Sequence, residues 1–360
     1  MIHSVYIHIP FCNHICSYCD FCKFYYNSNL ADKYLDELER EIKLNYKNDY
    51  INTIYIGGGT PSSLSCEQLT HLLDILKVFK GNICEYTIEC NVVSIDEEKI
   101  KLFKEYGINR ISVGIQTLND KYIKLLNRYH NKNMVIDKIN MIKKYINNIN
   151  IDLIYAIPNE TLDELEDDLD FVLKLDVNHI SAYSLIIEEH TKLFIDNVIN
   201  ISEDLDYSMY ELICNKLINN GYTHYEISNF AKDGFESKHN LVYWNNYNYY
   251  GFGIGASGYI NDIRYDNTRS INKYLNGNHL FNSHKLDLKE TIENEFILGL
   301  RKLKGIDKNE FFKKYNIDIN SFDSVKKMLN DKKLIDDKKH IFINEKYLYT
   351  SNDILLEFIN

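Results

Sequence analysis

The sequence predicts an α/β protein: a partial (β/α)6 barrel of the TIM type, followed by a C-terminal helical domain that resembles a winged helix. Within residues 1–220, short runs rich in β-branched and aromatic residues alternate six times with amphipathic helical runs. This alternation is typical of a parallel sheet with crossover helices. The chain has only three prolines, Pro10, Pro61 and Pro158, and each follows a predicted strand. Because a closed barrel needs eight units, the barrel is expected to be open.

The element boundaries follow from hydrophobic periodicity and from capping residues. Ser65, with Gln68 three positions later, has the pattern of a capping box, and Gly107 is suited to end a helix. The predicted strands are residues 4–8, 52–56, 85–90, 110–115, 149–155 and 179–187. The predicted helices are residues 31–46, a helix that begins at Ser65, and residues 96–106, 120–127, 133–146, 162–173 and 203–218. Ligands are expected at the carboxyl ends of these strands.

The pattern changes near residue 285. Helical runs at residues 290–303, 308–315 and 321–331 precede strand-like runs at 333–335 and 340–343. We therefore expect three parts, in chain order: the barrel (1–220), a connecting segment with a glycine-rich loop (221–284) and a winged-helix-like domain (285–360). Since the last part is not strongly basic, a role in protein contacts or as a lid is favoured over DNA binding.

The charge of the chain argues against general nucleic-acid binding, although the average leaves room for a local basic patch. The formal net charge is −11, whereas nucleic-acid binding needs a basic face. The N-terminal residues lack the charged and apolar regions of a secretory signal, and the sequence has no apolar stretch of the length that spans a bilayer. These features predict a cytoplasmic protein, and peripheral contact with a membrane stays open.

Three cysteines form the most informative motif. Cys12, Cys16 and Cys19 have C-x3-C-x2-C spacing, and thiolates on one loop can hold three corners of a [4Fe–4S] cluster. The fourth iron can then bind S-adenosylmethionine (SAM), whose reductive cleavage yields a 5′-deoxyadenosyl radical. Zinc is the alternative, but zinc sites usually pair two distant C-x2-C units. Cys22 as a fourth ligand would block SAM, so it is expected to be a non-ligand.

Polar residues at the ends of the predicted strands form a candidate rim for SAM. The run Gly57-Gly58-Gly59-Thr60 comes after one strand, and glycines let the backbone approach a ligand closely. The other rim residues are Glu89, Gln116, Arg128 and Asp152. The run at residues 253–258 matches G-x-G-x-x-G, but residues 259–265 do not have the pattern of a helix, so a dinucleotide site is rejected.

With these motifs, the chain resembles the HemN/HemW group of radical SAM proteins over nearly its whole length. The resemblance lies in residues 6–12, 16–21, 57–62, 110–116, 127–130 and 152–158. It implies the radical SAM form of the partial barrel, with Cys12, Cys16 and Cys19 on the cluster. The SAM contacts that it implies are Tyr6, Gly57, Gly58, Thr60, Glu89, Gln116, Arg128, Asp152 and Ile186. One departure is Ala156, where the group usually has glycine.

Two features favour the HemW side of this group. Phe21 stands where the dehydrogenases have a fourth cysteine, and His239-Asn240-Leu241-Val242-Tyr243-Trp244 matches the H-N-x-x-Y-W motif that is associated with haem. The resemblance implies that His239 is a haem ligand and that Tyr243 and Trp244 pack against the porphyrin. A structural histidine beside core aromatics is the alternative for this segment.

The leading hypothesis is a haem chaperone that binds haem and a SAM-liganded [4Fe–4S] cluster and passes haem to an acceptor protein, in solution or at the membrane. The implied electron donor is a flavodoxin- or ferredoxin-type protein. One alternative is an oxygen-independent coproporphyrinogen III dehydrogenase, which decarboxylates propionates by radical chemistry. Another is a radical SAM methyltransferase of the same group. Whether the chain is an enzyme is left open at this point.

Overall fold

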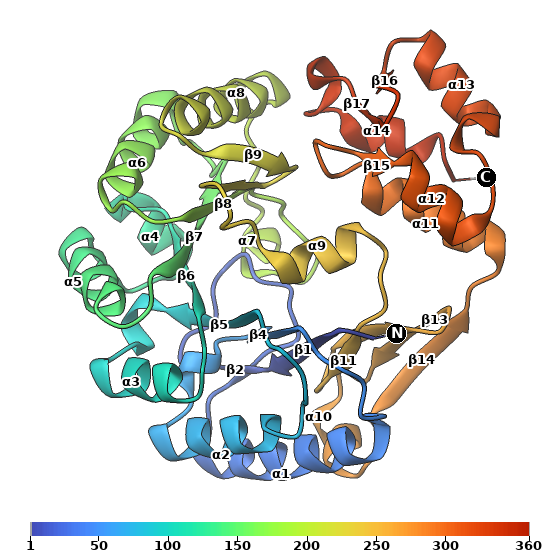
Figure 1. Cartoon of the computed structure of the whole chain (residues 1–360). Coiled ribbons are helices and arrows are strands. Elements are labelled where there is room, and N and C mark those ends of the chain that lie inside the picture. Colours follow the sequence, from blue (N-terminus) through green and yellow to red (C-terminus); the bar gives the residue numbers. More distant parts are fainter. Residues whose placement is uncertain (1, 360) are drawn as a thin grey trace.

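The computed structural model describes residues 2–359, and its centre is a nine-stranded sheet (Figure 1). Six consecutive strands of this sheet run parallel, in the order in which they occur in the chain. They are β1 (Ser4–Ile9), β4 (Thr53–Gly58), β5 (Glu85–Asn91), β6 (Arg110–Gln116), β7 (Asn148–Tyr155) and β8 (His179–Ser184). This confirms the six predicted βα units and the partial barrel.

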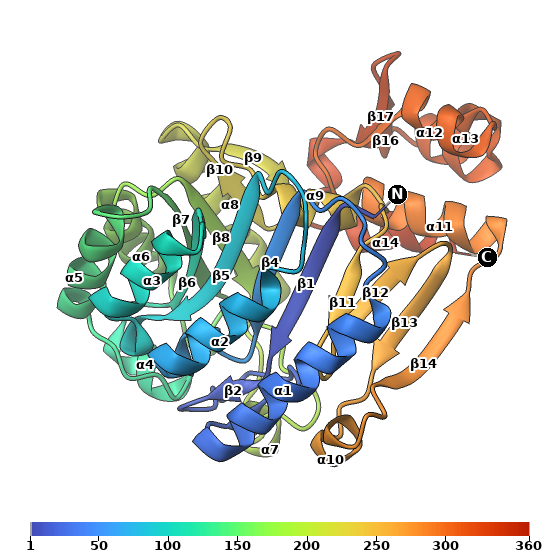
Figure 2. The same cartoon turned by 60° about the horizontal axis from the view of Figure 1, so that its bottom comes forward.

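Helices cover the outer face of these strands (Figure 2). Side-chain caps fix where several of them begin: Ser65 with Gln68, and Thr161 with Glu164, form complete capping boxes. The helices on this face are α1 (Ser28–Asn45), α2 (Cys66–Leu76), α3 (Glu97–Glu105), α4 (Asp120–Leu125), α5 (Lys132–Lys143), α6 (Leu162–Lys174) and α8 (Glu203–Asn219), whereas the short α7 (Lys192–Ile195) lies at the carboxyl ends of the strands. Each predicted helix is present, with ends that differ by a few residues.

Strands from segment 221–284 form both edges of the sheet. β11 (Tyr250–Phe252) pairs parallel with β1, and β10 (Asn229–Ala231) pairs antiparallel with β8 and with β9 (Thr223–Glu226). Helix α9 (Lys238–Trp244) connects the two edges and contacts β4. The sequence did not predict these strands, because three or four residues carry too little periodicity to be recognised.

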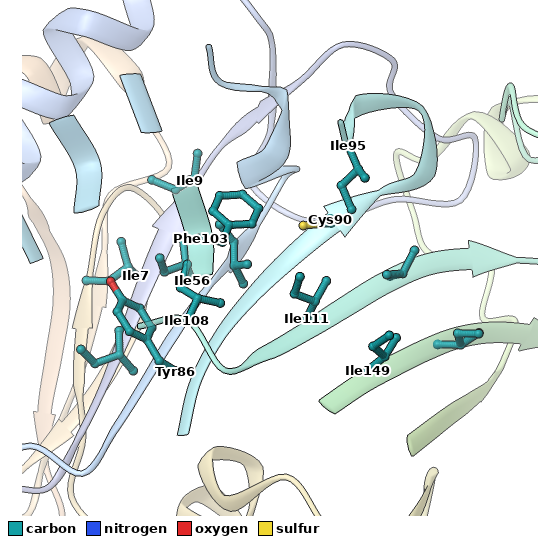
Figure 3. Packing of buried hydrophobic residues seen from close by; sticks show 14 of the residues in the cluster. Ile7, Ile9, Ile56, Tyr86, Cys90, Ile95, Phe103, Ile108, Ile111 and Ile149 are labelled. Carbon is teal, nitrogen blue, oxygen red and sulfur yellow. The ribbon is translucent and has the colours of Figure 1, made fainter. Parts of the chain in front are cut away.

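The six parallel strands have one apolar and one polar face. Outward side chains such as Ile7, Ile56 and Ile111 pack with Phe103 of α3 in the main core (Figure 3). The alternate positions are polar, and hydrogen bonds link many of them to each other. By strand order they are Ser4, Tyr6 and His8; Thr53 and Tyr55; Glu85, Thr87 and Glu89; Arg110 and Ser112; Asn148, Asn150 and Asp152; His179, Ser181 and Tyr183. The barrel therefore encloses a polar interior.

The C-terminal part has a hydrophobic core of its own, which includes Phe296, Phe311 and Phe358. Its elements are α11 (Leu288–Gly299), β15 (Ile306–Asp307), α12 (Lys308–Tyr315), α13 (Asp323–Asn330), β16 (Leu334–Asp336), β17 (His340–Ile343) and α14 (Ser351–Leu356). The predicted helices and hairpin are present, and β15 and α14 are additional. Over residues 2–359, no helix combines the length and the apolar character that a membrane span requires.

A three-stranded antiparallel sheet beyond β11 is fastened to the barrel through Glu41 of α1. Its strands are β12 (Ser257–Ile260), β13 (Ile263–Asn267) and β14 (Leu280–Lys285), with α10 (Ile271–Leu275) between the last two. The Glu41 carboxylate is 2% exposed and accepts hydrogen bonds from Gly253 N (2.8 Å), Asn267 Nδ2 (2.6 Å) and the Tyr274 hydroxyl (2.5 Å). One side chain thus joins α1, the glycine-rich loop and α10.

Replacement of this carboxylate should destabilise the protein. We expect Glu41→Ala to lower the free energy of unfolding by about 3 kcal/mol, because three buried donors lose their acceptor. Glu39→Ala, on the same helix but in an exposed ion pair with Lys43, should change it by less than about 0.5 kcal/mol. Urea unfolding measures both. Equal effects of the two substitutions would contradict the fastening role of Glu41.

Candidate functional site

The three motif cysteines lie on a loop at the carboxyl ends of the barrel strands. β2 (Phe11–Cys12) comes directly after β1 and pairs with β3 (Phe24–Tyr25). Between them, the loop is held from two sides: Ser17 N donates to Leu126 O (3.1 Å), and Leu193 N of α7 donates to Ser17 O (3.0 Å). Cys12 is buried, whereas Cys16 and Cys19 are partly exposed. The loop therefore presents thiols at the mouth of the barrel.

The electrostatics of this loop suit an iron–sulfur cluster. Burial raises the pKa of the Cys12 thiol to about 11, and burial also raises the pKa of Cys19. A bound metal lowers these pKa values again, because its positive charge stabilises the thiolates. The Arg128 guanidinium lies 3.6 Å from Cys16 Sγ and adds positive charge. In the described residues, no group of three such side chains lies close enough for a single metal ion; a cluster is larger, and its ligands stand further apart.

The glycine run after β4 is shaped by close contacts. Gly58 has φ +117°, and a Cβ there would lie 2.7 Å from the His8 ring. At Gly59, a Cβ would lie 2.8 Å from the Pro10 carbonyl carbon and 3.0 Å from Cys12 Sγ. Thr60 Oγ1 lies 3.4 Å from the same sulfur. These glycines let the turn approach the cysteine loop closely.

Two carboxylates, Glu89 and Asp152, face the same interior. Glu89 accepts hydrogen bonds from the Tyr55 hydroxyl (2.7 Å) and Gly58 N (3.1 Å), and Asp152 accepts from Ser112 and Asn150. Burial, with the Asp152 charge as a smaller contribution, raises the pKa of Glu89 to about 7. Burial also raises the pKa of Asp152. A pair of partly exposed interior carboxylates of this kind suits a cationic ligand, whose charge would stabilise both.

Gln116 and Arg128 meet above Gly114. A Cβ on Gly114 would lie 3.0 Å from Gln116 Nε2 and 3.7 Å from Arg128 Nη2, which donates a hydrogen bond to Gly114 O. Gln116 has φ +75° at a register shift between β6 and β7. A left-handed non-glycine residue is strained, and such strain is frequent at binding sites. Within the described residues, Arg128 Nε is buried without a hydrogen-bond partner.

The remaining SAM candidates are less closely tied to this rim. Tyr6 is partly buried on β1, packs 6.2 Å from the Tyr55 ring and hydrogen-bonds to His8 Nδ1. Ile186 lies just after β8 and is 67% exposed. Cys22 is buried beyond the cysteine loop, with its sulfur 4.0 Å from Arg269 O and its β-carbon against the position of Gly255. The glycine-rich loop thus packs beside Cys22.

The haem candidates lie apart from the rim. His239 lies in the first turn of α9, is 0% exposed, and hydrogen-bonds through Nδ1 to Thr53 Oγ1 (2.8 Å) and through Nε2 to the Tyr243 hydroxyl (2.8 Å). Burial lowers the pKa of His239 to about 3. Tyr243 and Trp244 are partly buried on the same helix. The structure thus brings His239 and Tyr243 into contact, with both imidazole nitrogens engaged in hydrogen bonds, whereas Trp244 lies against the Arg301 guanidinium of the C-terminal part.

The sequence analysis did not identify several interior residues. Tyr55 orients Glu89, and Glu85 accepts hydrogen bonds from Lys238 N (2.8 Å) and His239 N (2.9 Å) at the start of α9. Arg110 is 2% exposed inside the barrel. The available signal was the alternation of polar and apolar residues along each strand, which marks these positions as one inward face.

The raised pKa of Glu89 predicts a pH-dependent effect on stability. Because the folded pKa (about 7) lies above the ordinary 4.5, the folded chain retains a proton that the unfolded chain loses, and stability falls as pH rises through that window. In the ligand-free protein, Glu89→Gln should therefore raise the free energy of unfolding by about 2 kcal/mol at pH 8 and by much less at pH 5. Denaturation of both proteins at the two pH values measures this, and no gain at pH 8 would contradict it.

The cysteine loop gives a second prediction. After anaerobic reconstitution, Cys12→Ala, Cys16→Ala and Cys19→Ala should each retain less than about a quarter of the iron and sulfide of the unsubstituted chain, because three thiolates hold the cluster. Cys22→Ala is the matched control a few residues further along the chain and should retain nearly all of it. If Cys22→Ala lost the cluster while one of the other three variants kept it, Cys22 would be a ligand and this assignment would be wrong.

Comparisons with known proteins identify relatives of the whole chain. Residues 6–172 match the Radical SAM superfamily. The Heme chaperone HemW of Lactococcus lactis is 39% identical, over 99% of this chain and 97% of the relative. The protein of the same name from Bacillus subtilis is 38% identical over 99% of both.

A solved structure, the coproporphyrinogen III oxidase HemN of Escherichia coli, superimposes with a TM-score of 0.87 over 99% of this chain and 90% of that one. It shares 22% sequence identity and therefore shows the fold alone. The resemblance predicted from the motifs is confirmed by the full-length relatives. From these relatives and the superfamily match, the chain belongs to the HemW family of radical SAM proteins.

Proposed function

We propose that this protein is a haem chaperone, which binds haem and a SAM-liganded [4Fe–4S] cluster and passes haem to an acceptor protein. The observation that carries this proposal is the full-length likeness to proteins named Heme chaperone HemW. That likeness spans the barrel, helix α9 and the C-terminal part together. It favours a haem carrier over proteins that share the barrel alone.

The cluster is proposed to be held by Cys12, Cys16 and Cys19, with SAM at the neighbouring rim. When bound, the reduced cluster supplies the electron for reductive cleavage of SAM. Arg128, beside Cys16, would pair with a carboxylate of SAM or offset thiolate charge. The proposed SAM contacts are those of the sequence analysis, Tyr6, Gly57, Gly58, Thr60, Glu89, Gln116, Arg128, Asp152 and Ile186.

The two interior carboxylates supply the charge that this ligand needs. SAM carries a sulfonium group, and Glu89 and Asp152 are interior acids whose raised pKa values fall when a cation binds. Tyr55 and Gly58 N fix the Glu89 oxygens. These residues would bind and orient the ligand, and the glycine turn lets the backbone lie close to the cysteine loop.

Haem is proposed to bind through His239, with Tyr243 and Trp244 against the porphyrin. Since the His239 imidazole is buried and hydrogen-bonded at both nitrogens, ligation requires α9 to move away from β4. The short length of α9 and its place outside the main helical layer make such a movement reasonable (Figure 1). The neutral imidazole, favoured by a pKa of about 3, is the form that ligates iron.

The partners and the location follow from this activity. We propose a flavodoxin- or ferredoxin-type electron donor, a haem-acceptor protein, and a cytoplasmic location with peripheral contact at the membrane where the acceptor is membrane-bound. We also propose the division into a barrel (1–220), a connecting segment (221–284) and a C-terminal winged-helix-like domain (285–360). The separate hydrophobic core of the last part supports its treatment as a unit.

A coproporphyrinogen III dehydrogenase activity is the second candidate, because the HemN structure has the same fold. Phe21, 63% exposed on the cysteine loop, stands where the dehydrogenases have a further cysteine. The assay is the decarboxylation of coproporphyrinogen III with SAM and a reductant. Sustained turnover would replace the chaperone proposal with an enzymatic one.

The chaperone proposal predicts saturable haem binding that depends on His239. Titration of the reconstituted protein with haem should shift the Soret band until about one haem is bound per chain. His239→Ala should weaken binding at least about tenfold, because the iron loses its axial ligand. His284→Ala, an exposed histidine on β14, is the control and should bind haem as the unsubstituted chain does.

Two other outcomes of the haem titration would change this proposal. An unsubstituted chain that shows no saturable shift would contradict the chaperone function. Saturable binding that is equal in His239→Ala would keep the function and place the axial ligand elsewhere.

A further inference from the structure

His239 touches the residue that orients Glu89. The imidazole lies against the Tyr55 ring, with centroids 5.2 Å apart and planes tilted by 31°. The Tyr55 hydroxyl in turn donates to Glu89 Oε1 at 2.7 Å. A chain of direct contacts thus leads from the start of α9 to the carboxylate proposed for SAM.

The histidine is fixed to the same strand by a second contact. Its Nδ1 is 2.8 Å from Thr53 Oγ1, two residues before Tyr55 on β4, so both side chains face the interior. Glu85 at the start of β5 holds the first backbone N–H groups of α9. His239 is therefore packed against two successive interior side chains of β4, and its imidazole holds the Tyr55 ring in place.

Haem ligation and the packing against β4 require the imidazole in two different positions. Nε2 is occupied by the Tyr243 hydroxyl at 2.8 Å, and the side chain has no exposed surface within the described structure. A haem iron reaches an imidazole nitrogen only if the ring leaves this position. The Tyr55 ring would then lose its contact with the imidazole, and the Tyr55 hydroxyl would no longer be fixed as the donor that orients Glu89.

We propose that His239 is a positioning residue of the SAM site, acting through Tyr55 on Glu89, and that haem ligation and SAM binding therefore compete for one imidazole. The competition rests on the proposed function, whereas the positioning role can be measured without haem. By linkage, haem must weaken SAM binding by the same factor by which SAM weakens haem binding.

The C-terminal part holds the other end of α9 and takes part in this competition. Lys302 Nζ donates to Asn245 Oδ1, Lys314 Nζ donates to Asn245 O (2.6 Å), and the Arg301 guanidinium lies 5.7 Å from the Trp244 ring centre. Asn245 is the C-cap of α9. Withdrawal of the helix from β4 must therefore shift or release these contacts, which links haem ligation to the position of the C-terminal part.

The experiment compares SAM and haem affinities in the anaerobically reconstituted full-length protein. Equilibrium dialysis with labelled SAM gives its dissociation constant with and without saturating haem, and Soret titration gives the haem constant with and without saturating SAM. We expect each ligand to raise the dissociation constant of the other about fivefold or more, by equal factors. Equal constants in both conditions, or mutual tightening, would overturn the competition while haem binding itself stands.

Two conservative variants separate the steps without removing a core side chain. Tyr55→Phe keeps the ring beside His239 but removes the donor to Glu89, so SAM binding should weaken about fivefold while haem affinity in the absence of SAM is unchanged. Tyr243→Phe frees Nε2, so haem binding should tighten about threefold or more with SAM affinity unchanged. Unchanged SAM affinity in Tyr55→Phe would overturn the positioning role.

His239→Ala completes the set. It should weaken SAM binding in the absence of haem and remove the effect of haem on SAM binding. A histidine with a merely structural role would not give this result together with the tighter haem binding of Tyr243→Phe. If the unsubstituted chain binds no haem saturably, the proposed function and the competition both fail. Weaker SAM binding in Tyr55→Phe and His239→Ala would then still support the positioning role, and unchanged binding would overturn it.

Discussion

The barrel interior is a buried polar surface, and every polar group on it needs a partner. The inward positions of six strands carry charged or hydrogen-bonding side chains, among them Arg110, Glu85 and Asp152. An unpaired buried polar group costs about 1–3 kcal/mol, so this interior has to be closed by other elements of the chain. At the amino ends of the strands, α9 serves this purpose, since Glu85 binds its first N–H groups and Thr53 binds His239.

The carboxyl ends of the strands are organised differently. There, Glu89 and Asp152 have raised pKa values because burial is only partly offset by hydrogen bonds. Gln116 and Ala156 both adopt left-handed φ angles, +75° and +59°, where β6 and β7 end. Ala156 occupies a position that usually holds glycine in the group that this chain resembles, and a Cβ makes this conformation less favourable by about 1 kcal/mol. The mouth of the barrel therefore carries backbone strain, as binding sites commonly do.

Helix α9 gives the two ends a physical connection. It lies between β4 and the C-terminal helices, and its residues contact Tyr55 on one side and Lys302 and Lys314 on the other. A carrier must bind its cargo and also release it, and a short helix that shares its contacts with the SAM site offers a route for such control. In this structure His239 is a core residue, and the proposed ligation of haem would require a second position of the helix.

The sequence by itself determined the order of the six βα units, the capping of α2 and the place of the cysteine loop, because each depends on residues close together in the chain. Tertiary structure decided the edge strands β9, β10 and β11, the burial of His239, and the partnership of Tyr55 with Glu89. Hydrogen bonds such as His239–Thr53 join residues 186 positions apart. Local periodicity carries no information about such pairs, since only the packed chain brings the two segments into contact.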